Sequence, residues 1–484
     1  MKTNALYKAM LWLGCLASAM NLSAQQPFPD CPPDSVDKNM HKRQMLWQLG
    51  IHLPQLPNTR IDPNRPYGTT PRYPDALKEN PYGWTDTEDY ASTAPRDLYF
   101  FRTDWGLWNN FREEMTGSYE PLDLLTADDG TSITTPELWC SKRAPELRRH
   151  CEECIWGFVP AAADSLRIRW SAHSVQEEDS FCRRCLRQDI TGLIDTSRYP
   201  RIQHAPVLKA HLWLPASLAK GTRTHIVIHI GECRPDFKQA VLAEGWGYLQ
   251  FEHQLLQADS GAGLSDYLIG LVSQGQWRRP SDWGVIRAWA WGVSRIIDYL
   301  EREVPSVDAS RCGLVGHSRL GKTAIAAAVF DTRITAIYAC CSGCLGVSPV
   351  RRHFGEDLEF IPYYWFAGNM MRYCGAKFGD QYLPRKVADL PVDTPAFIAL
   401  LAPRHILITT GEDDLWSDPY GACLAARAAT PVYRLLGTEG LVMTDARPLV
   451  GAPYQGGHIV FHHHTGGHDY HPQSLPAFIG MMKE

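Results

Sequence analysis

The 484-residue sequence predicts an α/β fold in which one mostly parallel sheet is covered by helices on both faces. Short apolar or alternating runs, which are typical of strands, alternate along the chain with segments whose apolar residues recur every three or four positions. That order is typical of strands joined by helical crossovers. A hydrophobic content of 44% is enough to bury a large core.

The individual elements follow from these patterns. Strands are expected at 205–215, 223–230, 245–252, 311–316, 333–341 and 404–411, and helices at 137–155, at 281–303 and directly after Ser318. Ser281 and Asp282 are residue types that commonly cap a helix start, so we expect them to cap the helix at 281–303. In such sheets, sites form at the carboxyl ends of the strands.

The chain is expected to have three regions. Residues 1–24 combine a basic start, an apolar run and small residues before Gln25, which indicates a signal peptide, with lipid attachment at Cys15 less favoured. Residues 25–136 form an irregular extension rich in Pro, Asn and aromatic residues, with an insertion at 84–118. Residues 137–484 form the α/β domain. We therefore expect an exported, periplasmic or secreted protein.

Net charge and hydropathy argue against a nucleic-acid-binding protein and against a membrane-spanning protein. The formal charge of −5 gives no basic surface for nucleic acid, and beyond the leader no apolar run is long enough to cross a bilayer. We expect no membrane span and a monomer.

Thirteen cysteines remain after removal of the leader, an odd number. Two CxxC pairs, Cys151/Cys154 and Cys182/Cys185, stand 27 residues apart, an interval too long for an ordinary zinc ribbon. Because exported proteins usually oxidise their thiols, we expect structural disulfides between or within these pairs, with zinc as the alternative.

Ser318 stands in the stretch 316–321, GHSRLG, where a strand ends on glycine and a helix begins. A nucleophilic serine on a sharp strand-to-helix turn needs this setting, although the second glycine comes one residue later than in the common Gly-x-Ser-x-Gly pattern. From the motif alone, Ser318 is either a nucleophile or a helix cap.

Two cations follow this serine. Arg319 and Lys322 lie in the first turn of the expected helix, where the helix dipole disfavours positive charge. An arginine there is favoured if it faces a carboxylate or a developing oxyanion. The pair therefore indicates an anionic or polyhydroxylated ligand.

A serine nucleophile needs a base and an acid, which in this fold type come later in the chain in the order acid, then histidine. Asp414 follows the strand at 404–411 in a Gly-x-x-Asp arrangement and is our candidate acid, with Glu412, Asp413 and Asp418 as competitors. His468 lies on the loop after the last strand and is our candidate base.

The segment around His468 holds further histidines, namely His458, His462, His463, His464 and His471. Three consecutive strand residues point to opposite faces and cannot all bind one ion, so we predict no metal site there and no cofactor.

The motifs "GHSRLGK", "CCSGCLG", "RRHFGED", "WFAGN", "EDDLWSDP" and "GGHD", taken in this order, resemble the bacterial glucuronoyl esterases of carbohydrate esterase family 15. The resemblance covers most of the chain after the leader and is weakest at 84–118. It implies an α/β-hydrolase fold, a three-layer sandwich, and a carboxylic ester hydrolase of the 4-O-methyl-glucuronoyl methylesterase type.

The resemblance also assigns roles to residues. It implies that Ser318 is the nucleophile, His468 the base and Arg319 the oxyanion arginine. Lys322 and Glu356 would bind sugar hydroxyls, and Trp416 would contact the uronate.

One position departs from the family pattern. Cys341 stands where many members carry the catalytic glutamate, and a thiol substitutes poorly for a carboxylate. The triad is therefore complete only if Asp414 reaches His468.

The expected substrate is an ester between 4-O-methyl-glucuronic acid branches of xylan and lignin alcohols, met as glucuronoxylan or lignin-carbohydrate material. Two alternatives remain. One is an acetyl xylan esterase with the same triad, and the other is a non-catalytic glycan-binding relative.

Overall fold

The computed structural model describes residues 28–29, 32, 38–51, 113, 116, 118–180, 183–218, 221–352, 354–356, 358, 361–374, 385 and 387–484. The expected leader with Cys15, most of the expected insertion at 84–118, and Cys182 lie outside these residues.

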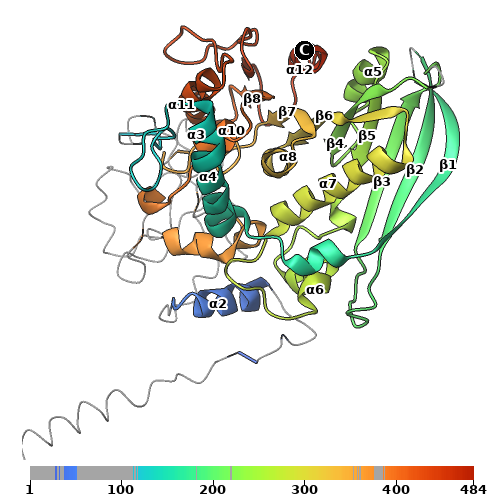
Figure 1. Cartoon of the computed structure of the whole chain (residues 1–484), viewed down its shortest axis with the longest axis horizontal. Helices are drawn as coiled ribbons and strands as arrows, with labels where there is room; N and C mark the ends of the chain where they lie inside the picture. Colours follow the sequence, from blue (N-terminus) through green and yellow to red (C-terminus); the bar gives the residue numbers. More distant parts are fainter. Residues whose placement is uncertain are drawn as a thin grey trace, which may run out of the picture.

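The described residues form one nine-stranded sheet with the order β1-β2-β3-β5-β4-β6-β7-β8-β9. The strands are β1 (Ile168–Ser180), β2 (Arg183–Ile194), β3 (Val207–Pro215), β4 (Thr224–Ile230), β5 (Gly247–Phe251), β6 (Val307–His317), β7 (Ile334–Cys340), β8 (His405–Gly411) and β9 (Ile459–His464). Strands β1, β2, β3 and β5 pair antiparallel in that order, and every pairing from β5 through β4 to β9 is parallel. Figure 1 shows the antiparallel strands as a curved edge of the sheet. The predicted mostly parallel sheet is confirmed.

Helices cover both faces of this sheet (Figure 1). The helices of the described residues, of which several lie on the sheet, are α2 (Lys38–Gln48), α3 (Pro136–Leu138), α4 (Ala144–His150), α5 (Pro235–Ala243), α6 (Tyr267–Ser273), α7 (Val285–Glu303), α8 (Arg319–Phe330), α10 (Thr394–Ala399), α11 (Pro419–Leu435) and α12 (Ser474–Lys483). In β4, Ile226 and Ile228 join the large core beneath α7, α8, α10 and α11, whereas Val227 joins the second core beneath α5 and α12. Because alternate strand residues face opposite sides, this pattern makes the predicted three-layer sandwich.

The expected helix at 137–155 is helical but not uniform. It runs through α3, a π-helical segment (Trp139–Arg143), α4 and a second π-helical segment (Cys151–Trp156). It ends at Gly157, whose φ of 82° is a conformation that glycine adopts readily.

Cys151 and Cys154 are free thiols, so the expected disulfide within this pair is not formed, whereas Cys182 of the second pair lies outside the described residues. Cys151 and Cys154 lie in the large core, whereas Cys185 lies in the second core, across the sheet. The separation rules out a bridge between the two groups, and it also prevents these three thiols from sharing one ion.

The start of α7 also differs from expectation. The helix begins at Val285 with Gly284 as the N-cap residue, and not at Ser281 or Asp282. A Cβ atom on residue 284 would lie 2.2 Å from the carbonyl oxygen of Trp365, so close packing requires glycine at the helix start. The carboxylate of Asp282 instead accepts a 2.9 Å hydrogen bond from the backbone of Arg279.

The amino-terminal extension was expected to be irregular, yet residues 38–48 form the helix α2. Met45 and Leu46 of this helix are buried in the large core, and the amide of Gln48 donates a 2.9 Å hydrogen bond to the carbonyl of Arg278. This part of the extension is therefore packed onto the α/β core. Within the described ranges, none of the helices combines the length and apolar character that a bilayer crossing requires.

Candidate active site

Ser318 lies on a sharp turn between β6 and α8, with φ 55° and ψ −125°. A non-glycine residue rarely adopts a positive φ, and such strain is typical of a nucleophile held above a sheet. Its backbone N–H donates to the carbonyl of Cys340 at 2.8 Å, which fixes the turn to the end of β7.

The glycines around Ser318 are needed for close packing. A Cβ on Gly316 would lie 2.1 Å from the carbonyl oxygen of Leu320, and one on Gly321 would lie 1.8 Å from the hydroxyl of Ser342. Gly321, which stands one residue later than the second glycine of the Gly-x-Ser-x-Gly pattern, is the position that faces Ser342 and has no room for a side chain. The sequence motif and the turn geometry agree.

His468 follows β9, and its Nδ1 lies 2.7 Å from Oδ2 of Asp414, which follows β8. The hydroxyl of Ser417 lies 3.3 Å from the same ring nitrogen. The ring of His468 packs edge-on against the ring of His317, the residue before Ser318, with centroids 4.6 Å apart. The structure thus brings the candidate base and acid together beside the serine turn.

Asp414 is buried, with 5% of its surface exposed. Burial opposes its ionisation, but the hydrogen bond and charge of His468, with hydrogen bonds from Ser417 and Cys341, hold its pKa below the ordinary value. The carboxylate is therefore ionised and can orient an imidazole and stabilise its protonated form.

Of the three carboxylates that competed with Asp414 as the candidate acid, two are exposed and one is buried in another ion pair. Glu412 and Asp413 are exposed. Asp418 is buried, accepts a hydrogen bond from the backbone of Gly421 at 2.9 Å at the start of α11, and pairs with Arg352 at 3.0 Å. Among these carboxylates, Asp414 is the one bonded to His468.

The rings of His462, His464 and His471 pack against one another, and several histidines of the segment also have partners elsewhere. The ring of His462 bonds to Ser474 at 2.7 Å, and that of His463 lies 3.1 Å from the hydroxyl of Thr410. His458 stacks on His405 with ring centroids 4.1 Å apart.

Arg319 has a partner that the sequence did not indicate. Its Nε lies 2.7 Å from Oδ2 of Asp259, and the indole N–H of Trp365 donates to Oδ1 of the same carboxylate at 2.6 Å. Asp259 comes from the loop after β5, and Trp365 lies 106 residues further along the chain. The Arg319 side chain is 38% exposed. It is therefore held in one orientation while part of it stays available to a ligand.

His253 lies near this guanidinium and is 5% exposed. Burial, and then the charge of Arg319, lower the pKa of His253 to about 4. The ring is therefore neutral at neutral pH, so Arg319 does not face a second positive charge there.

Lys322 is 1% exposed, and its ammonium donates to the carbonyls of Ser342 at 2.5 Å and Cys344 at 2.7 Å. Its third contact is a 2.7 Å ion pair with Glu356. Burial raises the pKa of Glu356, and the Lys322 charge opposes that shift. All three ammonium hydrogens are used within the protein, so Lys322 supports the Glu356 carboxylate directly.

Glu356 and Trp416 lie on adjacent segments, because the backbone N–H of Glu356 donates to the carbonyl of Trp416 at 2.7 Å. Gly343 has φ 55°, and a Cβ there would lie 2.4 Å from Oε2 of Glu356. The glycine lets the backbone approach the carboxylate. The predicted ligand-binding residues Lys322, Glu356 and Trp416 are thus brought together.

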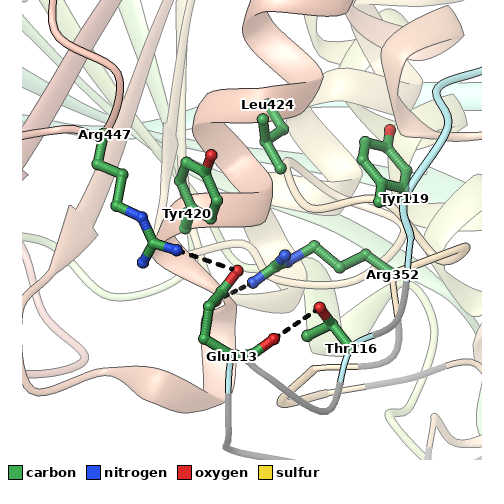
Figure 2. A pocket seen from close by; sticks show the side chains of 7 residues that line it. All are labelled: Glu113, Thr116, Tyr119, Arg352, Tyr420, Leu424 and Arg447. Atoms are coloured by element: carbon green, nitrogen blue, oxygen red, sulfur yellow. Dashed lines mark hydrogen bonds and ion pairs between the residues drawn. The ribbon is translucent and has the colours of Figure 1, made fainter.

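A cavity of about 650 Å³ adjoins the Arg352–Asp418 pair. Figure 2 shows its lining, which is Glu113, Thr116, Tyr119, Arg352, Tyr420, Leu424 and Arg447. Glu113 pairs with both arginines, and both guanidinium groups lie over the ring of Tyr420 at 5.1 and 4.4 Å from its centroid. The described end of the expected insertion therefore lines a polar and aromatic cavity.

Cys341 is 1% exposed, and its Sγ lies 3.7 Å from the carbonyl oxygen of Asp469. A hydrogen bond with Cys340 and burial raise the pKa of the Cys341 thiol far above its ordinary range. The thiol is therefore neutral and cannot supply the charge of a carboxylate.

Several known esterases are similar to this chain in sequence. The profile of the family described as "Glucuronyl esterase, fungi" matches residues 208–437. A carbohydrate esterase from an unknown prokaryotic organism is 28% identical over 378 residues, which cover 69% of this chain and 82% of that protein. A 4-O-methyl-glucuronoyl methylesterase from Hypocrea jecorina is 31% identical over 168 residues, and the match spans 34% of its length.

Solved structures are similar over more of the chain. A CE15 glucuronoyl esterase from Teredinibacter turnerae has a TM-score of 0.71 and 29% identity, and the match covers 92% of this chain and 99% of that one. A glucuronoyl esterase from Solibacter usitatus has a TM-score of 0.66 and 27% identity over 77% of this chain and 99% of its own.

Proposed function

Because the chain resembles the bacterial glucuronoyl esterases of carbohydrate esterase family 15, with their α/β-hydrolase fold, we propose that it is a serine esterase of the 4-O-methyl-glucuronoyl methylesterase type. Its substrates are esters between the 4-O-methyl-glucuronic acid side chains of xylan and lignin alcohols. The leader at 1–24 exports the chain to where this material is found. The observation that carries the proposal is the 2.7 Å contact of His468 with Asp414 beside the strained turn of Ser318.

In the first half of the reaction, His468 accepts the Ser318 proton as the hydroxyl oxygen attacks the ester carbonyl of the uronate. The Asp414 carboxylate holds Nδ1–H, so that Nε2 is free to act as the base. The developing oxyanion faces the Arg319 guanidinium and backbone N–H groups at the start of α8. The alcohol then leaves with the proton from His468.

In the second half, water enters and His468 removes its proton as the oxygen attacks the acyl-enzyme. Ser318 recovers its proton when the uronic acid is released. Glu356 and Trp416 hold the sugar, and Lys322 keeps the Glu356 carboxylate in place. Aromatic faces suit sugar rings, which supports this role for Trp416.

The proposal is tested with methyl glucuronate and with a benzyl glucuronate ester. We expect turnover by the wild type and loss of turnover in Ser318→Ala, with the fold checked by circular dichroism. Retained sugar binding with no turnover in the wild type would instead identify a non-catalytic glycan-binding relative.

One similar structure is a reason to test more than one ester. A protein that is 25% identical over 78% of this chain is described as a promiscuous CE15 esterase from a marine bacterial metagenome. We therefore propose to measure the hydrolysis rates of acetylated xylan and of the glucuronate ester side by side. A higher specificity constant on acetylated xylan would make the chain an acetyl xylan esterase.

A further inference from the structure

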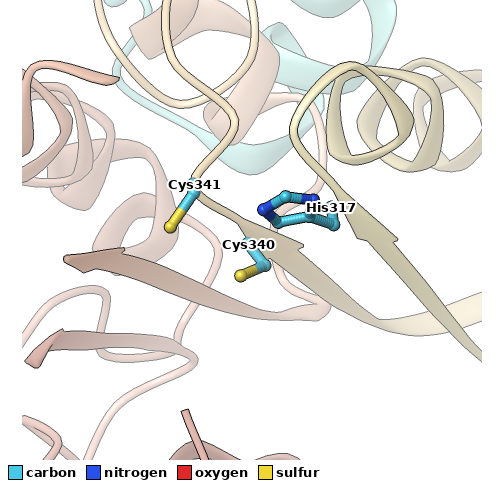
Figure 3. Close-up of side chains that lie close together, drawn as sticks. All are labelled: His317, Cys340 and Cys341. Atoms are coloured by element: carbon cyan, nitrogen blue, oxygen red, sulfur yellow. The ribbon is translucent and has the colours of Figure 1, made fainter. Parts of the chain in front are cut away.

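Two thiols and an imidazole lie together next to the Asp414–His468 pair. Figure 3 shows His317 at the end of β6, Cys340 at the end of the neighbouring strand β7, and Cys341 directly after it. His317 and Cys340 are paired in the parallel register of these strands. One ligand atom from each of the three residues lies within 4.8 Å of the other two.

The two thiols are buried and bonded to neighbouring groups, whereas one imidazole nitrogen has no hydrogen-bond partner in the described part of the chain. Cys340 and Cys341 are 0% and 1% exposed, and their Sγ atoms lie 3.5 and 3.7 Å from the carbonyl oxygen of Asp469. The Nε2 atom of His317 is buried and finds no hydrogen-bond partner within the described residues. Buried polar atoms normally have a hydrogen-bond partner, so the unpaired Nε2 nitrogen of His317 is a candidate ligand atom.

The chemistry of the donor set selects one class of ligand. Two sulfur atoms and one imidazole nitrogen are typical ligands of Zn²⁺ and Cu⁺, whereas Mg²⁺ and Ca²⁺ prefer oxygen. Zn²⁺ takes four ligands in a tetrahedral arrangement. The Cys341 thiol also lies within 4.8 Å of ligand atoms of Asp414 and His468, so the fourth position faces the candidate catalytic pair.

We propose that His317, Cys340 and Cys341 form a binding site for a thiophilic metal ion such as Zn²⁺, and that its occupation inhibits the esterase. The inhibition rests on the proposed function, whereas the binding does not. Each thiol that coordinates the ion releases its proton to solvent, and no electron is transferred. An ion held by Cys341 lies close to the Asp414 carboxylate and competes with His468 for it, because ligand atoms of the three residues lie within 4.8 Å of one another.

Binding is tested by titrating the purified, metal-free chain with Zn²⁺ by calorimetry and with Co²⁺ by near-ultraviolet absorption. We expect one equivalent of ion and a thiolate-to-cobalt band. Cys341→Ser and Cys340→Ser should each weaken binding about tenfold or more and reduce the band. Cys140→Ser, which alters an exposed thiol elsewhere, is the control and should bind as the wild type does.

Folding is checked by thermal unfolding, and the Cys→Ala variants provide a second test if a serine variant unfolds. A wild type that binds no stoichiometric ion, or variants of Cys340 and Cys341 that both bind as well as the wild type, would overturn the site. These results do not depend on esterase activity, so they are distinct from a failure of the proposed function.

Inhibition is tested on the same proteins by following hydrolysis of methyl glucuronate with and without Zn²⁺. We expect Zn²⁺ to slow the wild type, a chelator to restore it, and Cys341→Ser to keep its own uninhibited rate. Equal sensitivity of Cys341→Ser and the wild type would refute inhibition through this site.

Discussion

The guanidinium of Arg319 and the carboxylate of Asp259 form a 2.7 Å ion pair at the start of α8. Trp365 holds the other carboxylate oxygen at 2.6 Å. The ion pair means that the cation beside the serine is oriented before any substrate arrives. Preorganised donors cost no reorganisation when charge develops in the transition state.

We expect Asp259→Asn to lower kcat about tenfold, because Arg319 loses its orienting partner. Arg319→Ala removes the oxyanion donor itself and should lower kcat by about two to three orders of magnitude. The two effects should not add in the double variant, because both act through one guanidinium. Initial rates on methyl glucuronate measure this, with Asp298→Asn on α7, which alters the ion pairs with Arg295 and Arg333, as the control. Additive losses would refute the link.

Asp414→Asn should lower kcat by about four orders of magnitude, as in triads that lose their acid. Cys341 stands where many of the glucuronoyl esterases that this chain resembles carry a catalytic glutamate, and it offers a ligand atom within 4.8 Å of those of Asp414 and His468. We therefore expect Cys341→Glu to restore part of the rate in the Asp414→Asn background. A single Asp414→Asn variant that stays within about tenfold of the wild type would contradict the assignment.

Gly343→Ala should disturb sugar binding more than chemistry. Its Cβ would lie 2.4 Å from Oε2 of Glu356, and residue 343 has a positive φ of 55°. We expect a higher KM with a smaller change in kcat, since Glu356 contacts the sugar and transfers no proton in the proposed mechanism. Gly480→Ala on α12 meets nothing within 4 Å and serves as the control. A fall in kcat at constant KM would place Glu356 in the chemical step.

His253 should make the folded protein less stable in acid. Its pKa is lowered from 6.5 to about 4, so between these values the unfolded chain binds a proton that the folded chain does not. Stability should therefore fall as pH drops from 6.5 towards 4, by about 3 kcal/mol at most. His253→Phe should not show this part of the fall in the free energy of unfolding. Urea unfolding at pH 6.5 and at pH 4 measures the difference. Parallel pH profiles for the two proteins would show that His253 does not titrate in this way.

The residues of the candidate triad could be found from the sequence because parallel strands end at one edge of a sheet. Ser318, Asp414 and His468 each follow such a strand, so chain order and turn residues were enough to select them. The partner of Arg319 could not be found in this way. Asp259 and Trp365 stand in irregular loops more than 100 residues apart, and no periodic pattern connects them.

Burial explains two further differences between the structure and what the sequence predicts. Lys322 at a helix start indicates contact with a ligand, but its stem passes into the core and its ammonium is used by two carbonyls and Glu356. The expected disulfides followed from the compartment alone. The distribution of Cys151 and Cys185 between two cores is set by the sheet, which the spacing of the cysteines does not encode.

The helix α2 has a consequence for how far the functional unit extends. The amide of Gln48 bonds to the backbone of Arg278, whose guanidinium donates to the carbonyl of Phe366 at 2.6 Å, next to the indole that holds Asp259. Hydrogen bonds thus connect α2 with the segment that holds Asp259, the ion-pair partner of Arg319. We expect a version of the protein that lacks residues 38–48 to hold the Arg319 guanidinium less firmly in its orientation.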